Sequence, residues 1–328
     1  MSKTNNQQIT ENIKIKKLEK SQVEITGAVK AEEFSTFKKK ALQNINDEIT
    51  VDGFRKGKVP ENILLAKVGE MMVLEEMAEL ALSKAYPEII INEKIDALGR
   101  PEISITKIAS GNPLEFKIVT AVTPEIKMGD YAKIAKEENK KPVEIIEVAD
   151  KEVEDAIEKI KESHKDHAGH DHDSPEAKEQ IKKYLFDDKK MQVQEKKRIA
   201  LSDSLIETST IELPDILIES ELRRIEAQFS DDIERMGVKL EDYLKHAKKS
   251  IEEIRVEWRP HAEKKAKLQL IINEISKLEK IIPDAKEIEE EVNHIVTHYK
   301  DADRERAIIY AETVLTNEKV YKFLDEQK

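Results

Sequence analysis

The stretch VDGFRKGKVP, residues 51–60, separates two helix-like patterns and decides how the first third of the chain folds. Gly53 and Gly57 permit backbone angles that other residues resist, so the chain can turn tightly here. Pro60 then fixes φ where the next helix is expected to start. The pattern predicts a hairpin-like tip. The side chains expected to point outward from it are Phe54, Arg55 and Lys56.

On both sides of this tip the spacing of apolar residues predicts regular structure. Residues 13–30 alternate apolar and polar side chains, as half-buried strands do. Residues 31–49 instead place apolar side chains on one helical face. The members of that face are Phe34, Phe37, Ala41, Leu42 and Ile45. After the tip, a broad apolar stripe predicts a heavily buried helix, with the positions Leu64, Val68, Met71, Leu74, Ala78 and Leu82.

Two further strands are predicted at residues 101–108 and 113–126, joined by a turn at ASGN, residues 109–112. Together these elements predict a compact α+β unit that ends near residue 122.

The rest of the chain is predicted to be helical. Asp150 is a suitable N-cap for one helix, and Ser174 followed by Pro175 begins a long helix to about residue 208. The next helix starts near Pro214, and further helices follow from Leu240, with a bend or restart at Pro260. In the helix that starts near Pro214, one face carries Ile218, Leu222, Ile225, Phe229, Ile233 and Met236.

Composition agrees with thin, helix-rich architecture, because 38% of residues are charged and only 5% are aromatic. The expected fold class is α+β: an N-terminal α/β domain followed by an elongated, mostly α-helical C-terminal domain with arms. The expected boundaries are residues 1–122 for the first domain, 123–149 for a linker and 150–328 for the helical domain. No cysteine and no long apolar run occur, so a soluble cytoplasmic protein is expected.

Charge is unevenly distributed along the chain. Residues 1–112 hold 17 Lys/Arg and 17 Asp/Glu, whereas residues 113–328 hold 39 and 51. The acidic second part argues against broad nucleic-acid binding there. A contact with an anionic partner is expected near the tip, where the cations are Lys38, Lys39, Lys40, Arg55, Lys56 and Lys58.

No catalytic or nucleotide-binding motif is found in the sequence. There is no phosphate-binding loop, no dinucleotide fingerprint, no H-E-x-x-H and no cysteine nucleophile. We therefore expect no catalytic residue and no cofactor.

A histidine-rich stretch, HKDHAGHDHDS at residues 164–174, is the one weak metal candidate. Its four imidazoles could ligate Zn²⁺ or Ni²⁺, but a glycine divides them and no second ligand cluster is evident. We favour a solvated loop and expect no resident metal. The candidate ligands are His164, His167, His170 and His172.

Several segments resemble bacterial trigger factors, a family of chaperones that meet nascent chains at the ribosomal tunnel exit. GFRKGKVP at residues 53–60 resembles the family's ribosome-docking signature. ALGRPEISITKIASGNPLEFKIVTAVTPEIKMGDY, from residue 97, resembles the end of its ribosome-binding domain. EWRPHAEKKAKLQLIINEISKLEKI, from residue 257, resembles its helical C-terminal domain.

The resemblance implies an ATP-independent chaperone that docks on a large-subunit ribosomal protein and nearby rRNA, and involves no membrane. It implies that clients, which are nascent or unfolded polypeptides, are held by weak apolar contacts, and that the free protein forms a weak homodimer. Met191 and Met236 suit such contacts, but the sequence assigns no individual client-binding residue. The implied ribosome-binding residues are Gly53, Phe54, Arg55, Lys56, Gly57, Lys58 and Pro60.

One departure from the family is evident. Most members carry an FKBP-type prolyl-isomerase domain after the first arm helix, whereas here only residues 164–174 lie between two helices. So few residues cannot form a small β-sheet domain, so we expect the isomerase domain to be absent. Two alternatives remain at this point: a prolyl isomerase with a degenerate site, and a passive helical adaptor or metal-buffering protein.

Overall fold

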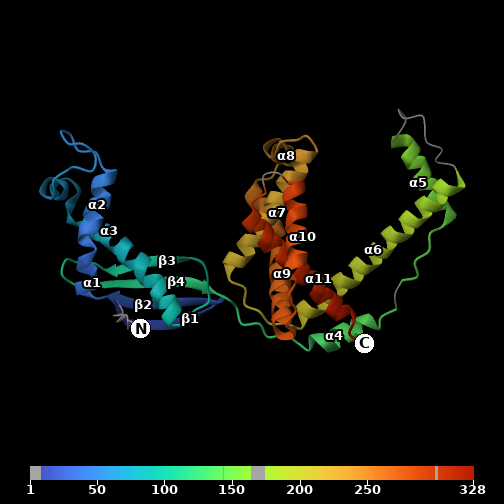
Figure 1. The fold of residues 1–328 in the computed structure, drawn as a ribbon, viewed down its shortest axis with the longest axis horizontal. Coiled ribbons are helices and arrows are strands. Elements are labelled where there is room, and N and C mark those ends of the chain that lie inside the picture. The colour runs from blue at the N-terminus through green and yellow to red at the C-terminus, as the bar shows by residue number, and fades with distance from the viewer. Residues whose placement is uncertain (1–8, 143, 164–173, 300–301) are drawn as a thin grey trace. The chain divides into compact units, whose positions relative to one another are not determined.

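The computed structural model describes residues 9–142, 144–163, 174–299 and 302–328, and Figure 1 shows the fold. An antiparallel sheet with three covering helices forms the N-terminal part, and helices form nearly all of the rest. The predicted α+β class is confirmed.

The four strands of the N-terminal sheet are β1 (Thr10–Leu18), β2 (Gln22–Val29), β3 (Ala97–Lys107) and β4 (Leu114–Val122). Their order in the sheet is β1-β2-β4-β3, and each pair is antiparallel. Strand β4 alternates buried and more exposed side chains, so one face of the sheet carries the core. The strand predictions for this region are confirmed.

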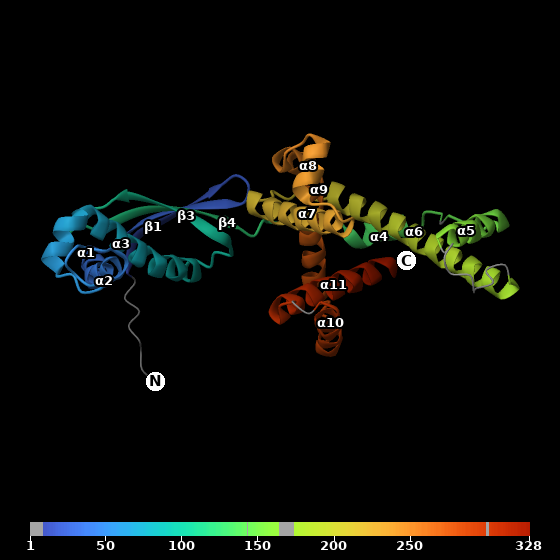
Figure 2. The same ribbon diagram turned by 90° about the horizontal axis from the view of Figure 1, so that it is seen from above.

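Three helices pack on the core-bearing face: α1 (Ala31–Thr36), α2 (Lys38–Glu48) and α3 (Glu61–Asn92). In Figure 2 they lie on one side of the sheet. The predicted face of residues 31–49 is buried at four positions, and Phe37 packs against the same core. Large, fully buried members of this core include Phe34, Phe116, Ile25, Leu64 and Ile118.

The predicted apolar stripe of α3 is wrong at Met71, whose side chain is 55% exposed, and Val68 is only half-buried. Gly69 has φ 81° and ψ 160°, so α3 consists of two helical segments joined at a kink. The kink changes the direction of the helix, and the face that enters the core after it starts at Val73 and Leu74 rather than at Met71.

The chain divides into two compact units. The first contains residues 1–125 and 212–263, which comprise the α/β part, α7 (Asp215–Arg235), α8 (Leu240–Ala247) and the first half of α9 (Ile251–Glu279). On α7 the predicted face is buried at Ile218, Leu222 and Ile233. It is wrong at Met236, which follows the last helical turn and is 75% exposed.

The second unit contains residues 126–211 and 264–328. Its helices are α4 (Tyr131–Asn139), α5 (Asp150–Ser163), α6 (Pro175–Glu207), the second half of α9, α10 (Ala285–His298) and α11 (Arg304–Asp325). The Ser174 side chain accepts a hydrogen bond from the Ala177 amide, which confirms the predicted start of α6. Helix α4 lies within the segment expected to be a linker, and α9 continues through Pro260 as one helix.

Candidate functional site

The tip at residues 51–60 joins α2 to α3 and is formed by short-range backbone hydrogen bonds. The Phe54 amide donates to the Val51 carbonyl at 3.1 Å, and the Lys58 amide donates to the Arg55 carbonyl at 2.9 Å. These bonds close two successive turns, so the tip has a defined backbone.

The two glycines of the tip have left-handed backbone angles, with φ of 85° at Gly53 and 78° at Gly57. A Cβ atom added at Gly57 would lie 2.7 Å from Oδ1 of Asp47, whereas one added at Gly53 would meet nothing within 4 Å. The left-handed backbone therefore favours glycine at both positions, and a side chain at position 57 would in addition displace the exposed Asp47 carboxylate.

The Phe54 ring is 37% exposed and is not part of the core cluster of the domain. Arg55, Lys56 and Lys58 are exposed as well, and no ion pair to their side chains is found among the described residues. Lys38 on α2, in contrast, lies 3.8 Å from Glu61. The tip thus combines a partly exposed ring with cations that have no acidic partner within this part of the protein.

The base of the tip is attached to the end of α2. Val59 is 4% exposed, and both of its backbone polar groups pair with the Asn46 side chain. The Asn46 carbonyl also accepts a hydrogen bond from the Gly57 amide at 3.0 Å. Pro60 lies at the N-cap of α3 with φ −58°, where its lack of an amide hydrogen is harmless.

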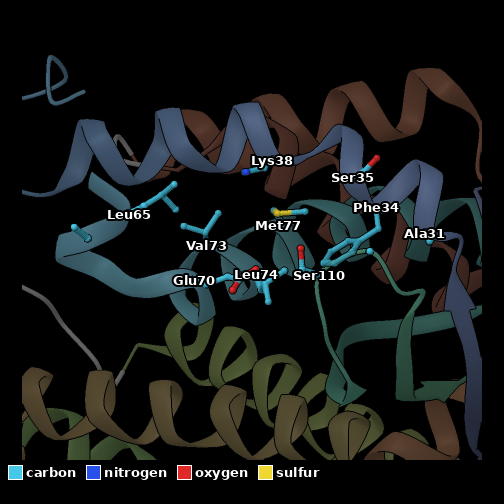
Figure 3. Close-up of a pocket in the computed structure, with 12 residues that line it drawn as sticks. Ala31, Phe34, Ser35, Lys38, Leu65, Glu70, Val73, Leu74, Met77 and Ser110 are labelled. Carbon is cyan, nitrogen blue, oxygen red and sulfur yellow. The ribbon is translucent and has the colours of Figure 1, made fainter. Parts of the chain in front are cut away.

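A cavity of about 410 Å³ lies in the same domain, between α1, α2, the two segments of α3 and the β3–β4 turn (Figure 3). Its apolar lining comes from Phe34, Leu65, Val73, Leu74 and Met77. Its polar groups are a Lys38 amine, a Glu70 carboxylate and two serine hydroxyls, with no histidine or cysteine among them. This arrangement can hold an apolar group, but it has no paired nucleophile and base.

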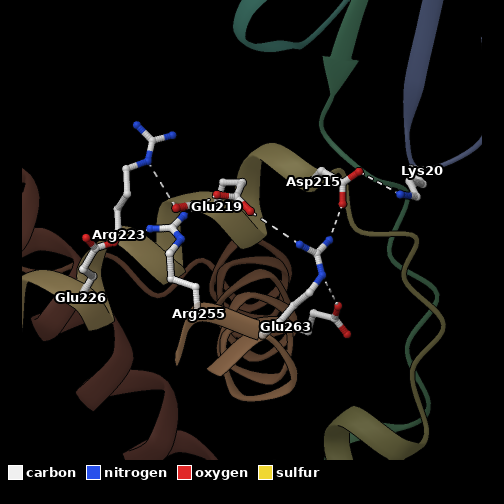
Figure 4. Close-up of polar contacts among 8 residues, drawn as sticks. Lys20, Asp215, Glu219, Arg223, Glu226, Arg255 and Glu263 are labelled. Carbon is white, nitrogen blue, oxygen red and sulfur yellow. Dashed lines mark hydrogen bonds and ion pairs between the residues drawn. The ribbon is translucent and has the colours of Figure 1, made fainter. Parts of the chain in front are cut away.

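A polar cluster in the first unit joins the β1–β2 turn to α7 and α9 (Figure 4). Lys20 Nζ lies 2.8 Å from Asp215 Oδ2, and Arg259 Nη2 lies 2.6 Å from Asp215 Oδ1. The hydrogen bond from Lys20, together with the one from Arg259, lowers the pKa of Asp215 despite partial burial of the carboxylate. Arg255 pairs with Glu219 and Glu226 on α7. The ion pairs of Arg255 and Arg259 join α9 to α7.

Titratable groups in the second unit also have structural partners. The hydrogen bond from Lys141 lowers the pKa of the buried Glu138, which also accepts from Ser204. The hydrogen bond to Glu279 raises the pKa of Tyr131 to about 12. The Ser204 contact joins α4 to α6 and the Glu279 contact joins α4 to the end of α9, whereas Lys141 lies just past the end of α4 itself.

Three exposed apolar side chains lie about two helical turns apart along one side of α6, with Asp188 and Glu195 between them on the same side. Tyr184, Met191 and Ile199 are all exposed, and a turn of 3.6 residues places them within about 80° of one another around the helix axis. No described element covers these side chains. Exposed apolar side chains of this kind can contact apolar groups of another polypeptide.

The described residues hold neither a metal-binding cluster nor a membrane-spanning helix. No group of three or more His, Cys, Asp or Glu side chains is placed there to hold a metal ion. The candidate ligands His164, His167, His170 and His172 lie outside the described residues. In the described part of the chain, no helix has both the length and the apolar character needed to cross a membrane.

Two sequence profiles of one protein family match the chain. The profile described as bacterial trigger factor protein matches residues 11–160, and the profile of the C-terminus of the same protein matches residues 175–325. Together they span most of the chain. The chain belongs to the trigger factor family.

Individual trigger factors agree with this assignment. The trigger factor of Carboxydothermus hydrogenoformans is 24% identical, over 90% of this chain and 92% of that protein. The trigger factor of Streptomyces avermitilis is 35% identical, over 45% of this chain and 31% of that protein. A solved structure described as "Promiscuous Substrate Recognition in Folding and Assembly Activities of the Trigger Factor Chaperone" shares the fold, with a TM-score of 0.53 and 16% identity, over 97% of this chain and 100% of that one.

The trigger factor profiles leave only residues 161–174 between them. The alignment with the Carboxydothermus protein extends over 400 positions, more than the 328 residues of this chain, so that relative contains residues that this chain lacks.

Sequence reasoning did not identify the Asn46 contacts, the cavity or the Lys20–Asp215 pair. An asparagine near the end of a predicted helix gives a weak signal for the first. The other two depend on residues that are distant in sequence, and no local pattern indicates them.

Proposed function

We propose that this trigger factor family member is an ATP-independent chaperone that docks on the ribosome and holds nascent or unfolded polypeptides. Residues 1–122 are the docking domain in this proposal, and residues 150–328 contribute the client-holding surface. The observation that carries it is the tip: a partly exposed Phe54 between cations that lack acidic partners in the described residues, on a defined backbone.

The tip suits a partner with an apolar pocket surrounded by negative charge. Fully burying a phenylalanine side chain contributes about 1.5–3 kcal/mol, so covering the exposed part of Phe54 contributes a fraction of that. Arg55 and Lys56 can pair with carboxylates of a ribosomal protein or with rRNA phosphates, which gives an attraction that weakens with salt. The docking residues of the proposal are Gly53, Phe54, Arg55, Lys56, Gly57, Lys58 and Pro60.

Client holding is proposed to use exposed apolar side chains such as Tyr184, Met191 and Ile199 on α6. Single contacts of this kind are weak, so a client can dissociate without nucleotide hydrolysis. Docking near the site where new chains emerge raises their local concentration, so a low affinity suffices.

We further propose that the chain does not catalyse prolyl isomerisation. The residues between the two family profiles are too few for a sheet domain, which needs several strands of about five or six residues each and their turns. A prolyl-peptide assay tests this part of the proposal.

The docking proposal is tested by co-sedimentation of the triple variant Phe54→Ala, Arg55→Ala, Lys56→Ala with ribosomes. We expect ribosome binding to be lost while the circular dichroism spectrum is unchanged. The matched control is Ile15→Ala, Lys16→Ala, Lys17→Ala on β1, which removes an equally exposed apolar side chain and two exposed cations from the same domain. Unchanged ribosome binding by the tip variant would overturn the docking assignment.

Client holding is tested separately, by suppression of aggregation of a denatured protein with added Zn²⁺ and with chelator. Equal suppression under both conditions supports a chaperone. Suppression that requires Zn²⁺, or none at all, would favour the metal-buffering or adaptor alternative.

A further inference from the structure

The side chain of Asn46 connects the last turns of α2 to the far end of the tip. Its amide nitrogen Nδ2 donates to the Val59 carbonyl at 2.9 Å, and its oxygen Oδ1 accepts from the Val59 amide at 3.1 Å. One side chain thus satisfies both backbone polar groups of a single residue 13 positions further along the chain. We call this pair of bonds the Asn46 clamp.

The backbone amide and carbonyl of Val59 need hydrogen-bond partners because of where this residue lies. The residue is buried, so its amide and carbonyl need partners within the protein. It precedes Pro60, which disfavours helical angles at Val59 and keeps it outside the hydrogen-bonding pattern of α3. The partner must therefore come from another element, and Asn46 supplies it.

A second contact also attaches the tip to the end of α2. The Gly57 amide donates to the Asn46 backbone carbonyl, and Asp47 Oδ1 occupies the space where a side chain at position 57 would lie. The backbone carbonyl and the side chain of Asn46 together hold the returning half of the tip against α2. Phe54, Arg55 and Lys56 lie between the end of α2 and these attached residues.

We propose that Asn46 is a positioning residue for partner docking: its clamp orders the tip before the partner arrives. The proposal rests on the docking function argued above. A loop that is already in its bound conformation loses less conformational freedom on binding, so its affinity is higher. If only a fraction of molecules holds the tip in place, the apparent dissociation constant rises by the inverse of that fraction.

The test compares Asn46→Ala with Asn44→Ala. Asn44 lies on the same helix and donates to Glu76 on α3 at 2.7 Å, so it is an asparagine with a bond to α3 but none to the tip. Neither variant changes a charge or removes a residue of the proposed docking set.

The first measurement is amide hydrogen exchange in the free protein. Loss of the clamp is expected to speed exchange at Val59 by about five- to thirty-fold in Asn46→Ala, which corresponds to one or two lost hydrogen bonds. Exchange at Ile118, in the core of the sheet, and exchange in Asn44→Ala are expected to match the unmodified protein. Unchanged exchange at Val59 in Asn46→Ala would overturn the clamp, whether or not the protein docks on ribosomes.

The second measurement is ribosome affinity over a range of salt concentrations. Asn46→Ala is expected to bind about five- to thirty-fold more weakly with the same salt dependence, because every tip cation remains. Lys56→Ala is expected to reduce the salt dependence instead. Faster exchange at Val59 with unchanged ribosome affinity would overturn the positioning role and leave docking intact, whereas normal binding by the Phe54, Arg55, Lys56 triple variant would overturn docking itself.

Discussion

The N-terminal sheet domain and the α10–α11 helix pair hold their elements together in different ways. The sheet domain has a contiguous core that reaches from β2 and β4 into all three covering helices. The helix pair buries Val292, Ala307 and Ala311 and adds partly buried apolar residues. It is also joined by ion pairs, with Arg304 Nη2 at 2.6 Å from Glu289 Oε1 and Lys319 Nζ at 2.9 Å from Glu287 Oε2.

This difference matters for the proposed function. Burial of apolar area supplies most of the free energy of folding, whereas exposed ion pairs contribute about 0–1 kcal/mol each. The sheet domain is therefore a stable base for the tip. The helix pair is expected to open at a lower free energy, as elements with few buried contacts do. The proposed function, client holding by a docked chaperone without nucleotide hydrolysis, needs both a firm attachment and helices whose apolar side chains are not all buried.

The largest expected effect comes from Phe116→Ala in β4. The ring is 1% exposed in the core of the sheet domain, so its removal is expected to destabilise that domain by about 3–5 kcal/mol. The measurement is urea unfolding, with amide exchange of β2 and β4 to assign the transition. The matched control is Phe186→Ala on α6, an exposed ring whose loss is expected to cost less than about 0.5 kcal/mol. Similar losses for the two variants would show that the N-terminal core is not the dominant source of stability.

A smaller effect is expected in the helix pair. Val292→Ala removes a fully buried side chain between α10 and α11, so it is expected to destabilise the pair by about 2 kcal/mol. Exchange of α10 amides should become faster while exchange in β4 stays the same. Val256→Ala, an exposed valine on α9, is the control. If Val292→Ala also speeds exchange in β4, the two regions unfold together and the comparison fails.

The sequence predicts the strands and helices of the sheet domain and the start of α6 well, because strand alternation, helix periodicity and the Ser174 cap are local signals. For α10 and α11 it predicts helical structure only in general, without their boundaries. It does not predict the kink at Gly69. The apolar spacing continues across that residue, and only the left-handed φ of the glycine shows that the register of buried positions changes. Met71 is exposed for that reason.

The candidate site likewise has features that the sequence predicts and features that it does not. The glycines, the ring and the cations of the tip are evident from ten residues of sequence. The Asn46 clamp is not, because it depends on how the end of α2 approaches Val59 in the folded domain. The pair of Lys20 and Asp215 joins residues 195 positions apart, which no periodicity can indicate.

The smallest expected effect concerns that ion pair and its pH dependence. The hydrogen bond from Lys20 lowers the pKa of Asp215 in the folded protein. The ionised Asp215 carboxylate therefore stabilises the folded protein at pH values above the ordinary aspartate pKa of about 4. This stabilisation is lost as the pH falls through the lowered pKa that Asp215 has in the folded protein. Since the Asp215 side chain is 42% exposed, the contribution is expected to be at most about 1 kcal/mol.

The measurement is urea unfolding of Asp215→Asn and the unmodified protein between pH 7 and pH 3, followed by fluorescence of Trp258. This is the only tryptophan of the chain, and its ring centroid lies 5.1 Å from that of Phe229 on α7, so it reports on the pairing of α7 with α9. The difference between the two proteins should be largest at pH 7 and should shrink toward pH 3, whereas Asp231→Asn, an exposed residue on the same helix, should show little difference throughout. A difference above about 2 kcal/mol at pH 7 would exceed the range of exposed ion pairs. Polar contacts would then hold α7 and α9 as firmly as buried side chains hold the sheet domain, and the contrast between apolar and ionic packing would not apply to these helices.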